Sequence, residues 1–205
     1  MGLHAALYLL IPGIRHRRAS FAGWTDRLAI ALALDGKVAI PMEYSVGFWR
    51  PRRLRRRLAR ELAQAIRVWN KGGVVPNLVT HSNGGVILCQ ALALDADIKV
   101  GTVCMVAPAA WRSMEQNGLN AALLTGRVQK LRIFASRGDR VLRYGGVSAI
   151  FSWLGKGYGR LGYDGPRDVD PRVAKRVEVI WEDHQNHGSW FSTKSLGRFI
   201  RQILA

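Results

Sequence analysis

Short runs of apolar residues alternate with longer amphipathic stretches along the chain. The first run, Leu7–Ile11, is continuous and stops at Pro12-Gly13, which is typical of a strand buried on both faces of a sheet. Similar runs recur at intervals until the last quarter of the chain. We expect six strands, at 7–11, 38–44, 78–79 with its neighbours leading to Ser82, 100–106, 131–136 and 177–181.

The segments between these runs carry apolar residues at helical spacing. The clearest is 51–69, where Leu54, Leu58 and Leu62 recur every four residues on one face and Pro51 suits the first turn. Because strands alternate with helices, the pattern predicts an α/β fold with a doubly wound, mostly parallel six-stranded sheet flanked by helices. Further helices are expected over 24–34, from Ser82 to about 94, within 109–128 and over 189–204, and a long loop over 141–175.

The chain has 205 residues, which suits one domain with a sizeable core. No internal repeat, low-complexity tract or linker divides it, so we expect a single domain over 1–205. Residues 1–11 lack a basic segment and are too short in apolar length for a secretory signal, and no apolar run is long enough to span a bilayer. A soluble cytoplasmic protein is therefore expected.

The segment Thr80-His81-Ser82-Asn83-Gly84 is the sharpest local signal. It predicts the end of a strand, an abrupt turn with Ser82 at its apex, and a helix that begins at once. Gly84 and Gly85 lie where a chain that reverses this sharply brings backbone close to backbone. The turn would leave the Ser82 hydroxyl exposed beside the first amides of the helix. Alternatively, Ser82 simply caps a buried helix.

This pentapeptide resembles the Gly-x-Ser-x-Gly nucleophile elbow of the α/β-hydrolases, with Thr80 in place of the first glycine. In an open parallel sheet, active residues gather at the carboxyl ends of the strands. The strand 131–136 leads to Asp139, and 177–181 leads to His187. The order Ser82, Asp139, His187 matches that of the family's catalytic triad, and the six strands match its core. The resemblance therefore covers nearly the whole chain.

The resemblance implies that His187 takes the proton of Ser82 and that Asp139 orients His187 and stabilises its charged form. Asp139 could instead be only a turn residue after Gly138. Its rivals as the acid lie deeper in the loop before the last strand. They are Asp164, Asp168 and Asp170.

His184 rivals His187 as the base. We prefer His187 because it precedes Gly188-Ser189-Trp190-Phe191, which is similar to the family's lead into the last helix. His184, His187 and Asp183 could instead form a metal site, but no further ligand cluster supports one. We expect neither a metal nor a cofactor. His81 is next to Ser82 but is expected to point the opposite way along the strand.

The resemblance also implies an oxyanion hole made of backbone amides. One donor is the N–H group of Asn83, and the second is that of Ile14 or Arg15, in the loop after the first strand. The connection after the fourth strand is too short for a lid domain, which favours an open site. Phe151 and Trp153 could form an apolar wall that accepts an acyl chain.

Charge adds a second line of argument. The chain has 31 Lys+Arg against 14 Asp+Glu, a net charge of +17, which favours anionic partners. Many of the arginines crowd the first half of the helix 51–69, among them Arg52, Arg53, Arg56 and Arg57. This row is either a solvated outer face or a surface that binds nucleic acid or an anionic membrane. No nucleic-acid-binding motif or aromatic stacking platform accompanies it.

Together these features predict a serine hydrolase, similar to small esterases and lipases, that cleaves a carboxylic ester or thioester through an acyl-enzyme on Ser82. An acyltransferase would use the same residues, because only the acceptor differs. The alternative is a non-catalytic protein of this fold whose arginine-rich helix is its working surface.

Cys89 and Cys104 lie in apolar runs, where thiols are typical small buried hydrophobes.

Overall fold

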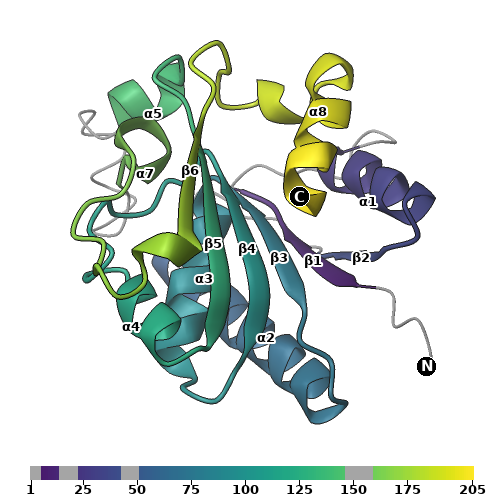
Figure 1. Ribbon diagram of the computed structural model, residues 1–205, viewed down its shortest axis with the longest axis vertical. Coiled ribbons are helices and arrows are strands. Elements are labelled where there is room, and N and C mark those ends of the chain that lie inside the picture. The colour runs from purple at the N-terminus through teal and green to yellow at the C-terminus, as the bar shows by residue number, and fades with distance from the viewer. Residues whose placement is uncertain (1–5, 14–22, 43–50, 146–158) are drawn as a thin grey trace.

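The computed structural model describes residues 6–13, 23–42, 51–145 and 159–205, without the side chains of residues 51, 52 and 145. Within these ranges six parallel strands form one sheet in the order β2-β1-β3-β4-β5-β6 (Figure 1). The predicted doubly wound parallel sheet is confirmed. Its strands are β1 (Leu7–Ile11), β2 (Val38–Pro41), β3 (Asn77–His81), β4 (Val100–Val106), β5 (Val128–Ala135) and β6 (Val177–Trp181).

Helices cover both faces of the sheet (Figure 1). One face carries α1 (Trp24–Leu34) and α8 (Thr193–Leu204), and the other carries α2 (Pro51–Lys71), α3 (Asn83–Leu94) and α4 (Leu119–Leu124). Along the described ranges, no helix combines the length and apolar character that crossing a bilayer requires. The connections hold the short elements α5 (Arg140–Gly145), α7 (Leu161–Asp164), η1 (Ala174–Arg176) and η2 (Ser189–Phe191).

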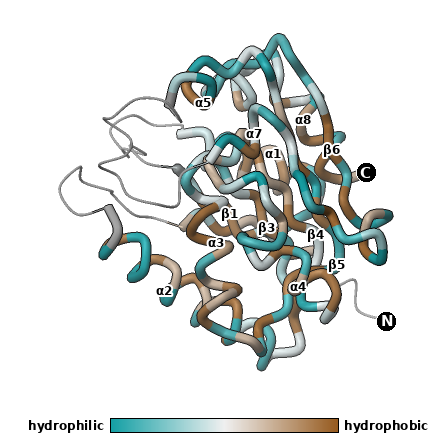
Figure 2. The backbone as a smooth tube through the Cα atoms, turned by 90° about the vertical axis from the view of Figure 1, so that its left-hand side faces the viewer, coloured by the Kyte–Doolittle hydropathy of each residue, from teal (hydrophilic) through white to brown (hydrophobic). Residues whose placement is uncertain are grey.

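Each inner strand contributes side chains to two hydrophobic clusters. In β1, Leu9 and Ile11 pack into the cluster under α2 and α3, whereas Tyr8 and Leu10 pack into the one under α1 and α8. Because successive side chains of a strand point to opposite faces, a strand covered on both sides needs apolar residues at every position. Figure 2 shows this as apolar strands in the interior behind the mixed colours of the helices.

Several boundaries differ from the predicted ones. β2 ends at Pro41, and the predicted end at Tyr44 lies outside the described residues. β5 begins at Val128 rather than Leu131, because its pairing with β4 starts at Val100. The connection 141–175 is not only loop, since it contains the end of α5, all of α7 and the start of η1. Ser192 has an extended backbone, which separates η2 from α8 where one closing helix was predicted.

Cys89 and Cys104 are free thiols in the interior. Burial disfavours the thiolate and raises the pKa of each to about 12. Because the thiolate is the reactive form, neither cysteine should react with dithionitrobenzoate at pH 8 in the folded protein, and both should react in guanidinium chloride. Counting released thionitrobenzoate in each condition checks this. Stoichiometric reaction of a thiol without denaturant would contradict the burial.

Candidate active site

The carboxyl ends of β1 and β3 lie side by side, because the chain runs from β1 out to the edge strand β2 before it returns to β3. Ligands of open α/β sheets bind outside such a reversal of strand order. Pro12-Gly13 follows β1, and Ser82 follows β3 directly. The loops after β5 and β6 then bring Asp139 and His187 to the same edge of the sheet.

Ser82 forms the turn between β3 and α3 with φ 53° and ψ −117°. Such a conformation costs a non-glycine residue about 1–3 kcal/mol and persists only where its surroundings enforce it. Two glycines allow those surroundings to come close. A Cβ on Gly84 would lie 2.4 Å from the carbonyl oxygen of Ile11, and one on Gly13 would lie 2.9 Å from the Cβ of Ser82. The turn is therefore packed directly against the end of β1.

The same packing explains why Thr80 is accommodated where the elbow pattern has glycine. The Thr80 side chain is fully buried. Gly85 lies opposite, because a Cβ there would be 3.7 Å from Thr80 Oγ1 and 3.2 Å from the Cβ of Pro108. Gly85, which has no side chain, thus leaves the space that the Thr80 side chain occupies.

His187 contacts both of the other predicted triad residues. Its Nε2 lies 2.8 Å from Ser82 Oγ, and its Nδ1 lies 2.7 Å from Asp139 Oδ2. The Asp139 carboxylate accepts a hydrogen bond from the Nδ1–H group, which leaves Nε2 to accept a hydrogen bond from the Ser82 hydroxyl. Burial is graded across the three, because Asp139 is fully buried, the His187 side chain is 17% exposed and Ser82 is half-buried. The three residues form one hydrogen-bonded chain from the interior towards the surface.

Asp139 also holds its own loop. Its Oδ1 accepts a hydrogen bond from the backbone N–H of Leu142, 3.0 Å away, at the start of α5. The turn role and the contact with His187 are therefore both present in one carboxylate. Gly138 allows the loop to approach the β6 loop, since a Cβ there would lie 2.3 Å from the carbonyl oxygen of Asp183. Ser136 completes the tie by donating its hydroxyl proton to the carbonyl oxygen of Gln185.

The rival acids point elsewhere. Asp164 pairs with Arg160 and Asp168 with Arg167, both by side-chain contacts within the connection. The hydrogen bond from Arg172 lowers the pKa of Asp170 to about 2. None of these three contacts involves Ser82 or His187.

His184 also turns away from Ser82. Its Nε2 lies 2.8 Å from Arg198 Nη2 and 3.5 Å from Glu182 Oε2, and its side chain is 61% exposed. Asp183 accepts a hydrogen bond from the backbone N–H of Arg137. The three side chains that the sequence suggested as a metal site thus have three separate sets of partners.

Comparison with known proteins finds similar structures but no similar sequences. No family model and no curated protein matches the chain. Solved structures do match, among them an α/β-hydrolase enzyme from a metagenome of lagoon sediments at Mar Chica, Morocco, with 14% identity and a TM-score of 0.55. That match covers 98% of this chain and 89% of the other.

An esterase domain of a Rhodothermus marinus protein matches with a TM-score of 0.54 and 14% identity, over 97% of this chain and 84% of that one. A soluble variant of the Saccharomyces cerevisiae monoglyceride lipase covers the same shares, with a TM-score of 0.50 and 14% identity. This chain has the α/β-hydrolase fold. The predicted resemblance is thereby confirmed at the level of the fold.

Within this α/β-hydrolase fold, His81 has a role that the sequence did not indicate. The expectation that it points away from the site does not hold. Its Nε2 donates a hydrogen bond to the backbone carbonyl oxygen of His187, 2.8 Å away, and the two imidazole rings are 5.0 Å apart. η2 folds the chain after His187 back over β3, which places Phe191 edge-on to His81. In the sequence, the only indication that His81 lies in the site was its position next to Ser82.

The structure describes one of the backbone amides that the sequence predicts for an oxyanion hole. Asn83 is the first residue of α3, where backbone N–H groups have no acceptor inside the helix. The Ile14 and Arg15 amides, predicted as the second donor, lie outside the described residues, as do Phe151 and Trp153 of the predicted acyl wall. Gly13, just before these two residues, is described, and its backbone lies against Ser82.

Most of the arginine row lies on the outer side of α2, although Arg55 is buried. Arg53, Arg56 and Arg57 are exposed, whereas Leu58 and Leu62 on the opposite side of the helix are buried. Arg57 pairs with Glu61 through a 2.7 Å contact between Nε and Oε1, one turn along the helix. The side chain of Arg52 lies outside the described set. Binding of an anionic surface by this row stays a prediction.

Proposed function

We propose that this protein is a serine hydrolase that cleaves a carboxylic ester or thioester through an acyl-enzyme on Ser82. The observation that supports this proposal is the position of His187 within hydrogen-bond distance of both Ser82 Oγ, at 2.8 Å, and Asp139 Oδ2, at 2.7 Å. A serine hydroxyl becomes a useful nucleophile when a neighbouring imidazole removes its proton. An esterase domain and a monoglyceride lipase among the similar folds favour carboxylic esters as the substrate class.

In the first half of the reaction, Ser82 Oγ attacks the carbonyl carbon of the substrate while its proton passes to Nε2 of His187. The charge that forms on the imidazole is stabilised by Asp139, whose burial keeps water from competing for the Nδ1 proton. Negative charge also forms on the carbonyl oxygen of the substrate, which would accept a hydrogen bond from the N–H group of Asn83. Collapse of the tetrahedral intermediate breaks the ester bond, and the leaving alcohol or thiol takes the proton from His187.

In the second half, His187 removes a proton from water, and the resulting hydroxide oxygen attacks the acyl carbon. The ester bond to Ser82 breaks, Ser82 Oγ recovers its proton from His187, and the carboxylic acid leaves. An alcohol or amine in place of water would give acyl transfer through the same residues. The His187 side chain is 17% exposed, so the imidazole is not sealed from solvent.

Labelling with a fluorophosphonate tests the proposal, because this probe bonds covalently to activated serines. Intact mass should show one adduct on the wild type and none on Ser82→Ala. His184→Ala is the matched control: it removes a nearby imidazole that contacts Glu182 and Arg198 instead, and it should label like the wild type. An unlabelled wild type, or an equally labelled Ser82→Ala, would contradict the proposal.

A further inference from the structure

A cavity of about 550 Å³ opens between the connection after β4 and the segment that contains α7. Its wall includes Trp111, Arg112, Gln116, Arg160, Asp164 and Arg167. None of Ser82, Asp139 and His187 lines it. The cavity is therefore separate from the proposed catalytic residues, and its chemistry requires its own account.

Backbone hydrogen bonds hold the two walls together. The N–H group of Arg167 donates to the carbonyl oxygen of Arg112 at 2.9 Å, and that of Met114 donates to the carbonyl oxygen of Arg167 at 3.1 Å. A β-bridge between Ser113 and Arg167 joins the same segments. In Figure 1, α7 accordingly lies beside the connection between β4 and α4. The side chains of the wall thus project from a fixed frame.

The wall carries more positive than negative charge. Among the described wall residues, the three guanidinium groups of Arg112, Arg160 and Arg167 stand against the one carboxylate of Asp164. That carboxylate lies 3.1 Å from Arg160 Nε and 3.8 Å from Arg112 Nη1. Arg167 contacts Asp168 at 3.4 Å, but both side chains are more than half exposed, and exposed pairs of this kind are weak. A guanidinium has five N–H donors, so these contacts leave capacity for a second anion.

Two backbone hydrogen bonds link the cavity wall to Ser82. The N–H group of Ala109 donates to the carbonyl oxygen of Ser82 at 3.0 Å, and the N–H group of Gly159, in the cavity wall, donates to the carbonyl oxygen of Ala109 at 2.8 Å. Trp111 follows two residues later, so its Cα is at most roughly 7.6 Å from that of Ala109. The Trp111 side chain is 43% exposed. It supplies an apolar surface in the cavity wall, next to Arg112 in the chain.

We propose that this cavity binds the anionic end of the substrate's acyl group, with a carboxylate or phosphate held by Arg112 and Arg167 and an apolar linker against Trp111. The inference rests on the proposed acyl-enzyme at Ser82. We assign the acyl part because it stays bound to Ser82 through both halves of the reaction. Charge-assisted hydrogen bonds to guanidinium suit carboxylates and phosphates in particular. The substrate class is therefore an ester or thioester of a dicarboxylic acid or of a phosphate-bearing acid.

Two matched substrates test this: mono-para-nitrophenyl glutarate, which ends in a carboxylate, and para-nitrophenyl valerate, which ends in a methyl group. Wild type should prefer the glutarate ester in kcat/KM. Arg112→Gln and Arg167→Gln should each lower kcat/KM for the glutarate ester by about tenfold or more, and lower it far less for the valerate ester. Lys99→Gln is the control. Lys99 is an exposed cation just before the amino end of β4, whereas Ser82 lies at the carboxyl ends of the strands.

Calorimetry on Ser82→Ala separates this proposal from the function itself. Glutarate or inorganic phosphate should bind to Ser82→Ala and not to Ser82→Ala with Arg112→Gln, and the tighter ligand shows which anion the cavity takes. Such binding without turnover of either ester would reject the proposed hydrolase and keep the anion site. Turnover of both esters with equal kcat/KM, or with equal losses in the arginine variants, would overturn the anion site and keep the hydrolase.

Discussion

Replacing His187 with alanine should lower kcat for a para-nitrophenyl ester by about 10⁶-fold, because the proton of Ser82 then has no acceptor. Replacing Asp139 with asparagine should lower it by about 10⁴-fold. The asparagine would still accept a hydrogen bond, but it can equally donate to Nδ1, which favours the tautomer that cannot take the serine proton. Initial rates of ester cleavage for the two variants and the wild type measure both losses.

His184→Ala is the control for this pair of variants. It removes an imidazole only three residues before His187, but one that contacts Glu182 and Arg198. Its kcat should stay at the wild-type value. Circular dichroism should show that all of these variants fold. If His184→Ala lost as much activity as His187→Ala, the assignment of the base would be wrong.

Gly84→Ala should destabilise the protein by about 1–3 kcal/mol and also lower its activity. The added Cβ would lie 2.4 Å from the carbonyl oxygen of Ile11 and 3.0 Å from that of Pro12. Both neighbours are backbone atoms, so they can move away only if the end of β1 or the start of α3 shifts. Either shift would move Ser82 relative to His187. Guanidinium unfolding, followed by circular dichroism, gives the change in the free energy of unfolding.

Gly197→Ala is the matched control for this change. Gly197 is an exposed residue of α8, and a Cβ there would meet only the end of the Arg201 side chain, at 4.0 Å. Because alanine favours a helix over glycine, this variant should be more stable than the wild type by about 0.5–1 kcal/mol. Equal effects of the two substitutions would show that β1 and α3 are not tightly packed at Gly84.

The inner strands could be predicted from the sequence because buried strands consist almost entirely of apolar residues. β1 and β4 are covered on both faces, which requires nearly unbroken apolar runs such as Leu7–Ile11. β5 was harder to place, since Gln129 and Lys130 interrupt its apolar pattern and its start is set by pairing with β4. Local pattern therefore locates a buried strand but not the ends that a neighbouring strand determines.

In the candidate site, too, some residues could be predicted from local sequence and others depend on tertiary contacts. Ser82, Asp139 and His187 could be predicted as one site because Ser82 directly follows β3, Asp139 and His187 lie in the loops after β5 and β6, and parallel strands end at one edge. The part played by His81 could not be found, since it depends on η2 folding back over β3. The cavity beside Trp111 was equally hidden, because its arginines come from two segments that are far apart in the sequence and meet through tertiary contacts.

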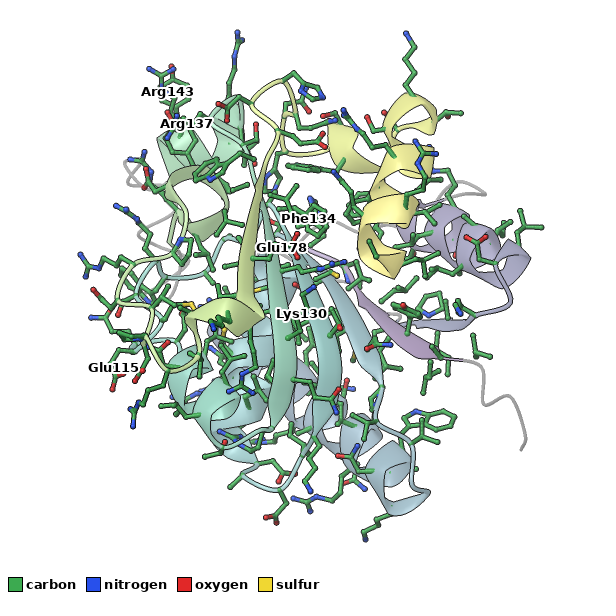
Figure 3. All side chains as sticks on the ribbon, viewed as in Figure 1. Glu115, Lys130, Phe134, Arg137, Arg143 and Glu178 are labelled. Atoms are coloured by element: carbon green, nitrogen blue, oxygen red, sulfur yellow. The ribbon has the colours of Figure 1, made fainter. Side chains whose placement is uncertain are left out.

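The tie between the β5 and β6 loops has a consequence for protein engineering. Gly138 lets the two backbones touch, and Ser136 bonds to Gln185, so the loops that carry Asp139 and His187 form one unit. Figure 3 labels Arg137, which lies near the start of this unit, and Phe134, which belongs to β5. A graft of the histidine loop alone into another scaffold would lack these anchors. The two loops are best transplanted together, as a single cassette.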